Sequence, residues 1–352
     1  MTRKFRIGII GLGGVAAAHL AAFRSLDMVE LVSVCDVRED VARTVAQESA
    51  ARSYTDYRRL LEDGGLDLVM VLTPASTHRT IVESVAEARI NVFCEKPLAV
   101  TLTDGEAIVA ACSKAGVKLF YGSCYRFLPA VRKAHELIRS GAIGAVTLMS
   151  EQVIGGNGIA GYRELGPIHY PPGGPGGGGM GLVDHGIHLI DVFSWFIGSA
   201  PDKVLGKGQI AGQPPETEFM IMSFPGGATG HLLYNAATYG AGLPNEGIFN
   251  GGQGWLTDGS IAQAGRWENE PGAISVYGTT GTLRIFHYAN ALFINRSEGL
   301  QQIALDGRPA FGHFATQLEA CIEAIQQDGV PQVTGVDGLR AMKALLGVYT
   351  SG

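Results

Sequence analysis

The first third of the chain alternates short apolar runs with segments in which apolar residues recur at helical spacing. The apolar runs are Phe5–Ile10, Leu31–Cys35, Leu68–Leu72, Val92–Cys94 and Val117–Tyr121. The helical patterns between them cover Val15–Leu26, Val41–Ala50, His78–Ala88 and Asp104–Ala115. Continuous apolar strands that alternate with helices predict a parallel, doubly wound sheet. We therefore expect an α/β dinucleotide-binding (Rossmann) domain over residues 1–122.

After Pro129 the pattern changes to strand-like runs separated by turn signals. These runs are Ala145–Ile154, Phe219–Phe224, Ala228–Ala236, Ile274–Tyr277, Thr282–Phe286 and Leu292–Asn295. Helical patterns cover Ala130–Arg139, Leu182–Phe196, His313–Gln327 and Val336–Tyr349. Strands joined by turns predict a mostly antiparallel sheet, and hence an α+β domain over residues 123–352. Packing of the last two helices against the first domain is left open.

Two Gly-rich segments, Gly155–Gly181 and Gly240–Gly272, are unusually long for loops. Loops beyond about 12–15 residues are usually functional or disordered. The first segment contains Tyr162, Arg163 and His169, which a purely flexible linker would lack. We expect both segments to contact substrate or a second subunit, with disorder as the alternative, and we take the three side chains as candidate substrate contacts.

The composition narrows the class of protein. Of the 352 residues 46% are apolar and 17% charged, and the net charge is −6, so no basic nucleic-acid footprint is expected. No run of 18 apolar residues predicts a membrane span. The five scattered cysteines lack a CxxC pair, which indicates a reducing, cytoplasmic compartment. The basic and then apolar start of the chain resembles a signal peptide, but it fits a strand and a phosphate loop better.

A glycine-rich segment follows the first strand and opens a helix. It reads Gly11, Leu12, Gly13, Gly14, Val15 and Ala16. In this pattern one glycine permits a tight turn, and the next lets the backbone approach a pyrophosphate. Asp36 ends the next strand, where a carboxylate accepts hydrogen bonds from ribose hydroxyls and repels a 2′-phosphate. We predict NAD as the cofactor. Arg38 keeps NADP open as the less favoured choice, and a turn without a ligand is the remaining alternative.

Thr73 and Pro74 end a further strand and are candidate cofactor contacts. His78 follows shortly after them. Two interpretations of His78 are equally open. It contacts the cofactor, or it lies in the first turn of a helix capped by Ser76 or Thr77.

Glu95, Lys96 and Pro97 follow the apolar strand Val92–Cys94. Two charged residues at a buried strand end are costly unless they are used, and the proline holds that end in a fixed turn, with a cis bond as one option. Strand ends of a parallel sheet face the ligand crevice. Beside a positively charged nicotinamide, Lys96 could hold a substrate hydroxyl and share in proton transfer. We predict that Lys96 is catalytic and that Glu95 and Lys96 contact the cofactor, with a surface ion pair as the alternative.

The helix predicted from Leu182 contains Asp184, His185 and His188. Asp184 and His188 are four residues apart and are expected on one helix face. A carboxylate oriented toward an imidazole suits a general base, so we predict that both are catalytic. A metal site formed by His185, His188 and an aspartate, and a structural helix start, are the alternatives; no metal is our expectation.

Three further residues are candidate substrate contacts. Asp191 lies three residues after His188, roughly in line with it. Tyr125 and Arg126 lie just past the last strand of the first domain, where a role as a crossover hinge is equally open.

Over nearly its whole length the chain resembles the Gfo/Idh/MocA oxidoreductases, the family of glucose–fructose oxidoreductase and inositol dehydrogenase. The matching segments read GLGGVA, TPASTH, CEKP, GAIGAV, GGMGLVDHGIHLID, VYGTTGTL and PQVTGVDGLRAM. The resemblance implies a Rossmann domain and an α/β domain whose open antiparallel sheet forms homodimers or homotetramers. It also implies that Lys96 is the catalytic lysine, that the bond before Pro97 is cis, and that His188 is the base beside Asp184. Ala75 departs from the family, which often has asparagine there, and this puts one cofactor contact in doubt.

The implied activity is hydride transfer between nicotinamide and a secondary hydroxyl of a sugar, polyol or sugar derivative. Some relatives instead oxidise a sugar transiently, eliminate a group and return the hydride, as glycosidases or lyases with recycled NAD. A non-catalytic nucleotide-binding sensor is the third alternative, and the presence of Lys96, Asp184 and His188 speaks against it.

Overall fold

The computed structural model describes residues 3–156, 170, 172–176, 181–214, 216–239, 273–307 and 311–350. The chain forms two compact units. The first unit comprises Met1–Ser123 and Phe314–Leu339, and the second comprises Cys124–His313 and Arg340–Gly352. Helix α9 (Gly312–Gln326) therefore belongs mainly to the first unit, and α10 (Gly335–Thr350) is divided between the two.

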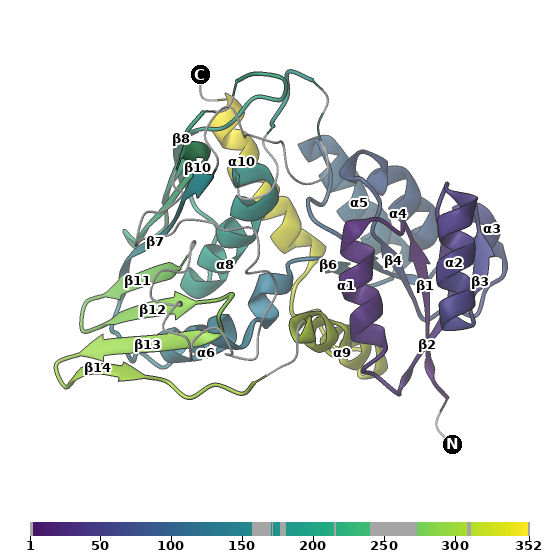
Figure 1. The fold of residues 1–352 in the computed structure, drawn as a ribbon, viewed down its shortest axis with the longest axis horizontal. Helices are drawn as coiled ribbons and strands as arrows, with labels where there is room; N and C mark the ends of the chain where they lie inside the picture. Colours follow the sequence, from purple (N-terminus) through teal and green to yellow (C-terminus); the bar gives the residue numbers. More distant parts are fainter. Residues whose placement is uncertain are drawn as a thin grey trace. The chain divides into compact units, whose positions relative to one another are not determined.

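The first unit is built on a six-stranded parallel sheet in the order β3-β2-β1-β4-β5-β6. Its strands are β1 (Phe5–Ile10), β2 (Val29–Cys35), β3 (Arg52–Tyr54), β4 (Leu68–Val71), β5 (Asn91–Cys94) and β6 (Leu119–Tyr121). The helices between them are α1 (Gly14–Phe23), α2 (Glu39–Ser49), α3 (Tyr57–Glu62), the 3-10 turn η1 (Ala75–Thr77), α4 (His78–Glu87) and α5 (Leu102–Ala115). Figure 1 shows α1 and α2 in front of the sheet and α4 and α5 behind it.

The strand order reverses between β1 and β4, which places the loops after these two strands at the switch point of the sheet. The central strand β4 is buried along its whole length, which explains its continuous apolar sequence. The edge strand β3 and the helix α3 were not predicted. The residues of β3 are polar and largely exposed, so they carry no apolar signal, and α3 has only six residues, with the side chain of Asp56 as its N-cap.

The second unit is built on an eight-stranded mixed sheet in the order β14-β13-β12-β11-β7-β10-β9-β8. Its strands are β7 (Val146–Gly156), β8 (Lys203–Lys207), β9 (Glu218–Ser223), β10 (Thr229–Tyr239), β11 (Ile274–Gly278), β12 (Thr282–Phe286), β13 (Ala291–Arg296) and β14 (Gly299–Gln302). Among the residues described up to Ile197, its helical elements are the 3-10 turn η2 (Cys124–Phe127), α6 (Pro129–Arg139), the π-helical turn η3 (Leu182–Gly186) and α8 (Ile187–Ile197). Only the β7–β10 pair is parallel among the described strand pairs of this sheet.

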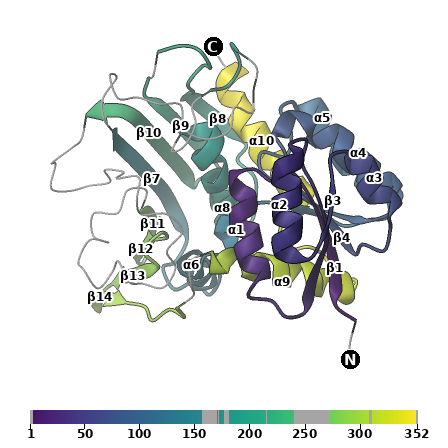
Figure 2. The same cartoon turned by 45° about the vertical axis from the view of Figure 1, so that its right-hand side comes forward.

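Helix α8 packs on β7, and α6 packs on β12 and β13 (Figure 2). Met149 and Val153 of β7 are buried, whereas Leu148 on the same strand is 37% exposed. Ile221 on β9 and Tyr277 on β11 are also exposed. The sheet therefore has one covered face and one face that presents apolar side chains to solvent.

The predicted fold class is confirmed: a doubly wound parallel sheet is followed by a mostly antiparallel one. Strands β8 and β14 were missed, because β14 is exposed throughout and β8 has no fully buried residue. None of the helices in the described ranges is both long and apolar enough to cross a membrane.

The prediction of one α-helix from Leu182 to Phe196 is wrong at its first turn. The N–H of Gly186 bonds to Gly181 O at 2.9 Å, which is the i→i+5 pattern of a π-helix. Regular α-helical structure begins only at Ile187.

Candidate active site

The glycine-rich turn after β1 has a backbone geometry suited to a bound pyrophosphate. Gly11 has φ +94°, and a Cβ there would lie 2.8 Å from backbone atoms of Leu72 and Thr73, so only glycine fits without strain. Gly13 and Gly14 are exposed, and a Cβ on either would meet nothing within 4 Å. Helix α1 has no side-chain cap and no acidic residue in its first turn. Its first N–H groups are therefore left for water or an anionic ligand.

Asp36 follows β2 and closes one side of this turn. Its Oδ2 accepts a hydrogen bond from Leu12 N at 2.9 Å, and its Oδ1 accepts from Arg38 N and Nε, each at 2.9 Å. Burial acts to raise the pKa of Asp36, but the bonds from Arg38 and Leu12 outweigh it and lower that pKa to about 2. Asp36 is thus a carboxylate at neutral pH, and the half-exposed Arg38 side chain lies against it.

Thr73 and Pro74 form the link between β4 and η1. Thr73 is half-buried, Pro74 is exposed, and Thr77 Oγ1 donates to Thr73 Oγ1 at 2.8 Å. Their predicted contact with the cofactor stays a prediction.

His78 ties the ends of two strands together from a fully buried position. Its Nε2 lies 2.7 Å from Thr73 O, and its Nδ1 lies 3.1 Å from Leu98 O and 3.2 Å from Cys94 Sγ. Burial lowers the pKa of His78. A neutral ring with its proton on Nε2 donates to Thr73 O and accepts from the Cys94 thiol. These contacts favour a structural position over a direct cofactor contact.

Glu95 is buried and holds the backbone that carries Lys96. Its Oε2 accepts from Lys96 N at 2.9 Å, and its Oε1 lies 2.9 Å from Nε2 of His19 in α1. The His19 ring is in turn enclosed edge-on by Phe93 and Phe314, with centroids 5.3 and 4.8 Å away. The Lys96–Pro97 bond is cis, as expected, and Lys96 itself is only half-buried.

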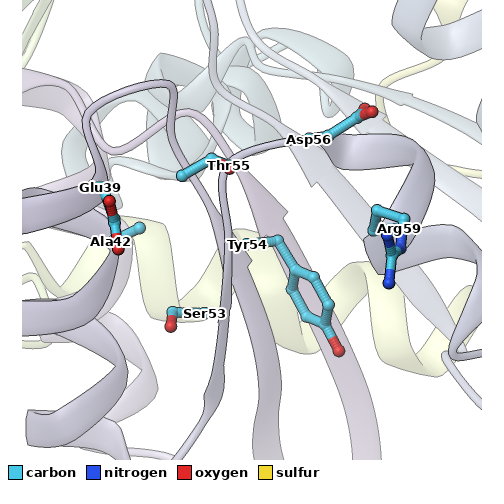
Figure 3. Close-up of a pocket in the computed structure, with 7 residues that line it drawn as sticks. All are labelled: Glu39, Ala42, Ser53, Tyr54, Thr55, Asp56 and Arg59. Carbon is cyan, nitrogen blue, oxygen red and sulfur yellow. The ribbon is translucent and has the colours of Figure 1, made fainter.

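A separate polar pocket of about 510 Å³ lies between α2, β3 and the start of α3 (Figure 3). It is lined by Glu39, Ala42, Ser53, Tyr54, Thr55, Asp56 and Arg59. In the close-up, Glu39 and Ala42 lie on one side, and Asp56 and Arg59 lie on the other. The pocket contains none of the predicted site residues.

In the second unit, Asp184 lies in the π-helical turn and His188 in the first turn of α8. Asp184 is half-buried, and His188 is 4% exposed. The turn is anchored by Glu218 of β9, whose Oε2 accepts from Leu182 N at 3.0 Å. Burial raises the pKa of Glu218 to about 7, although backbone hydrogen bonds from Leu182 and Gln209 oppose the shift. The start of the predicted catalytic helix is thus held by a buried acid that sequence reasoning did not single out.

Arg126 and Asp191, both predicted to contact substrate, form a buried ion pair with each other. Arg126 Nε donates to Asp191 Oδ2 at 2.7 Å, and Nη2 donates to Oδ1. The exposed fractions are 7% for Arg126 and 1% for Asp191. The bidentate pair joins η2 to α8, and this supports a structural function for these two side chains.

A polar cluster lies in the interior of the second unit, and the sequence alone did not predict that its members meet. It consists of Tyr125, Glu151, His185, Tyr234, His287 and Tyr288. Glu151 Oε1 accepts from His185 Nε2 at 2.8 Å, and Oε2 accepts from the hydroxyl of Tyr234 at 2.5 Å. His185 Nδ1 lies 3.0 Å from the Tyr125 hydroxyl and 3.1 Å from that of Tyr288. The Tyr125 ring stacks on His188, with centroids 4.2 Å apart and planes 5° apart.

One signal for this cluster is present in the sequence. Glu151 stands between the apolar residues Met149 and Val153, in the register of β7 that faces inward. A charged residue in a buried register needs partners, but the sequence does not show which partners.

The atoms of Glu151, His185 and His287 that could bind a metal lie within 4.8 Å of one another. This group differs from the metal site considered above, which paired His185 with His188 and an aspartate. Burial and the nearby His185 lower the pKa of His287 well below its ordinary value. The candidate substrate contacts Tyr162, Arg163 and His169 lie outside the described residues.

Two family models match the chain. One, described as "Oxidoreductase family, NAD-binding Rossmann fold", covers residues 5–123. The other, described as "GFO/IDH/MocA C-terminal domain", covers residues 131–284.

Several curated proteins are similar in sequence. D-apiose dehydrogenase of Paraburkholderia graminis is 38% identical over 143 residues, which are 40% of this chain and 38% of that protein. Myo-inositol 2-dehydrogenase of Thermotoga maritima is 36% identical over 140 residues, which are 40% of this chain and 42% of that protein. These two alignments thus span less than half of the relatives. 2,7-anhydro-N-acetylneuraminate hydratase of Escherichia coli is 26% identical over 87% of this chain and 79% of that protein.

Solved structures share the fold over the full length. An oxidoreductase domain protein from Kribbella flavida has a TM-score of 0.79 at 25% identity and covers 99% of this chain and 97% of its own. An oxidoreductase from Agrobacterium radiobacter, in complex with NAD+, L-tartaric acid and magnesium, has a TM-score of 0.78 at 19% identity. The match covers 99% of this chain and 96% of that one. With two family models that succeed one another along the chain, and with this fold, the protein belongs to the Gfo/Idh/MocA family of NAD-binding oxidoreductases.

Proposed function

We propose that the protein is an NAD-dependent dehydrogenase that acts on a secondary hydroxyl of a sugar, polyol or sugar derivative. The observation that carries the proposal is the glycine-rich turn after β1. Only glycine fits at position 11, the space beside Gly13 is open to a ligand, and the ionised Asp36 lies along one side of the turn. The sugar and polyol dehydrogenases among the relatives support the substrate class.

The residues of the first unit fit a dinucleotide. The backbone N–H groups of Gly13, Gly14 and Val15 would hold its pyrophosphate, and Asp36 would accept from its adenosine ribose hydroxyls. Bound NAD supplies a hydride acceptor at its nicotinamide ring. Repulsion between the Asp36 carboxylate and a 2′-phosphate favours NAD over NADP. Arg38 lies against Asp36 and partly offsets that repulsion.

In the proposed reaction His188 removes the proton of the substrate hydroxyl. Asp184 orients the substrate or the imidazole, and Lys96 holds the hydroxyl and stabilises the charge that develops on its oxygen. Glu95 supports Lys96 through the backbone N–H that it accepts. The turn before α8, anchored by Glu218, sets the position from which Asp184 and His188 project.

A panel of sugars and polyols assayed at 340 nm with NAD and with NADP tests the proposal. We expect activity with NAD, and a loss of about 10²- to 10⁴-fold in kcat for Lys96→Ala and for His188→Ala. The exposed Lys203→Ala and the half-buried His231→Ala serve as matched controls with unchanged turnover. Full turnover in the Lys96 and His188 variants would refute the proposed roles.

A recycling glycosidase, lyase or hydratase is the second candidate. It is favoured by the similarity to 2,7-anhydro-N-acetylneuraminate hydratase, which extends over most of both chains. A dehydrogenase accumulates NADH, whereas a recycling enzyme changes its substrate without net NADH. Product analysis of the same panel separates the two, and NAD binding without any product would indicate a sensor.

We further propose that the open face of the second sheet forms a homodimer or homotetramer. Leu148, Ile221 and Tyr277 are 37–41% exposed on strands β7, β9 and β11, and such apolar patches commonly mark interfaces. Light scattering after gel filtration should show an oligomer, and Ile221→Glu should shift it toward the monomer. The cytoplasmic location stays a prediction.

A further inference from the structure

The polar cluster is unusual because it buries several titratable groups in the interior of one unit. Glu151 is 1% exposed, His185 is 2% exposed, and Tyr234 is 1% exposed. Buried polar groups are costly unless they are hydrogen-bonded, so a cluster of this size needs a reason.

The Glu151 carboxylate can only accept hydrogen bonds, and this sets the hydrogen-bond directions within the cluster. The Glu151 carboxylate accepts from Tyr234 and from His185 Nε2, so the proton of a neutral His185 is on Nε2. His185 Nδ1 is then an acceptor for the Tyr125 or the Tyr288 hydroxyl, which also lie 2.7 Å from each other. Burial raises the pKa of Tyr125 well above its ordinary value, and hence its hydroxyl remains a donor.

The Tyr125 side chain links this network to His188. Its hydroxyl is anchored by His185 and Tyr288, and its ring lies parallel to the His188 imidazole, with centroids 4.2 Å apart. A ring that is hydrogen-bonded at its tip cannot tilt or slide without losing a buried contact. The stacked imidazole is therefore confined to one plane.

We propose that Tyr125, anchored through His185 by Glu151, is a positioning residue that fixes the plane of the His188 imidazole for proton transfer. This rests on the proposed function, in which His188 is the base. Precise orientation of a reacting group is worth a large factor in rate, because a displacement of about 1 Å can cost about 10²-fold.

A metal bound by Glu151, His185 and His287 is the competing explanation. The distance of 2.8 Å from His185 Nε2 to Glu151 Oε1 is that of a direct hydrogen bond. Nε2 cannot carry this proton and coordinate a metal at the same time. His287 Nε2 lies 3.7 Å from the same carboxylate oxygen, outside hydrogen-bond range. Glu151 and His185 are thus satisfied by hydrogen bonds in the observed arrangement, and the metal content of the purified protein separates the two explanations.

Steady-state kinetics of Tyr125→Phe, Tyr125→Leu and Glu151→Gln test the proposal. We expect kcat to fall about 10²-fold in Tyr125→Leu, which loses both the stacking ring and the hydroxyl, and about 10-fold in Tyr125→Phe, which keeps the ring. Glu151→Gln should resemble Tyr125→Phe. KM for substrate and Kd for NAD should stay within about threefold of the parent, and Tyr57→Phe, at a half-buried tyrosine in α3 of the first unit, should match the parent. Unchanged kcat in Tyr125→Leu, or a rise in KM alone, would overturn the proposal.

A second readout does not depend on turnover. In NMR spectra of the histidine rings, we expect the stacked Tyr125 ring to shift the carbon-bound ring protons of His188 upfield in the parent, and this ring-current shift to be lost in Tyr125→Leu. His185 should be protonated on Nε2. Absence of the His188 shift in the parent would overturn the proposal even if no substrate is found. So would stoichiometric bound metal in the purified parent that is lost in His287→Ala. If the NMR result holds while the substrate panel fails, the proposed function is wrong and the positioning remains.

Discussion

Each unit contains a buried carboxylate–histidine pair, and the two pairs are built differently. In the first unit Glu95 Oε1 lies 2.9 Å from His19 Nε2, and Glu95 Oε2 accepts a hydrogen bond from the backbone N–H of Lys96. In the second unit Glu151 Oε1 lies 2.8 Å from His185 Nε2, and Glu151 Oε2 accepts a hydrogen bond from the Tyr234 hydroxyl. One pair thus supports a turn of the chain, and the other supports a network of side chains.

The difference shows two ways in which a fold can place a functional group. Glu95 sits next to the residue that it positions, so the sequence marks the place. Glu151 acts through His185 and Tyr125 on His188, and these residues come from different elements of the second unit. The contacts of the second kind depend on the register and packing of the sheet.

The largest effect should come from removing each carboxylate. Glu151→Ala leaves His185 and Tyr234 without their buried acceptor, and we expect a loss of about 3–5 kcal/mol in the free energy of unfolding. Glu95→Ala should cost about 1–3 kcal/mol, because one of its two partners is a backbone N–H close to the half-buried Lys96. Urea unfolding and calorimetry measure both values, and the exposed Glu298→Ala should leave stability unchanged. Equal losses would remove the distinction between the two pairs.

The second prediction concerns the pH dependence of stability. The folded-state pKa of Glu218 is raised to about 7 by burial, above its ordinary value of 4.5. Its contribution to stability is therefore complete below about pH 4.5 and is lost as the pH rises through about 7. We expect Glu218→Gln to be more stable than the parent at pH 8, by on the order of 2 kcal/mol, and to lose this advantage toward pH 5. A constant difference between pH 5 and pH 8 would contradict the burial of this acid.

The third prediction concerns the glycine-rich turn after β1 in the first unit. Gly11→Ala introduces a Cβ at φ +94° and 2.8 Å from neighbouring backbone, and should cost about 1–3 kcal/mol. Gly13→Ala meets open space, so stability should be unchanged while NAD affinity falls, about 10-fold, because the Cβ stands where a pyrophosphate would approach. Thermal unfolding and calorimetric titration with NAD separate the two effects. Normal NAD affinity in Gly13→Ala would place the dinucleotide elsewhere.

The smallest change in stability with pH is expected from Asp36, whose pKa is shifted in the opposite direction to that of Glu218. Hydrogen bonds from Arg38 and Leu12 overcome burial and lower the folded-state pKa of Asp36 from 3.8 to about 2. Its contribution is present above about pH 3.8 and is lost as the pH falls through about 2. Because the Arg38 side chain is half-exposed, the contribution should be only about 1 kcal/mol. Asp36→Asn should therefore show a smaller loss of stability between pH 4 and pH 2 than the parent does.

The sequence predicted most in the first unit, whose elements follow from local patterns. The apolar strands of the first unit, the turn from Gly11 to Gly14 and the acid at Asp36 were all placed correctly, because each follows from local pattern and spacing. The edge elements β3 and β14 were missed because their exposed residues carry no apolar signal. The π-helical turn was missed because one extra residue in a turn leaves the helical apolar pattern almost unchanged.

By itself the sequence determined the parallel first sheet, the mostly antiparallel sheet of an α+β second unit and the residues proposed for the chemistry. Apolar periodicity and glycine geometry are local properties, and they can be read along the chain. The tertiary structure alone decided that Arg126 pairs with Asp191, that Glu218 anchors the turn before α8, and that Glu151 reaches His188 through His185 and Tyr125. These are contacts between residues distant in sequence, and they exist only once buried polar groups must find partners within a packed interior.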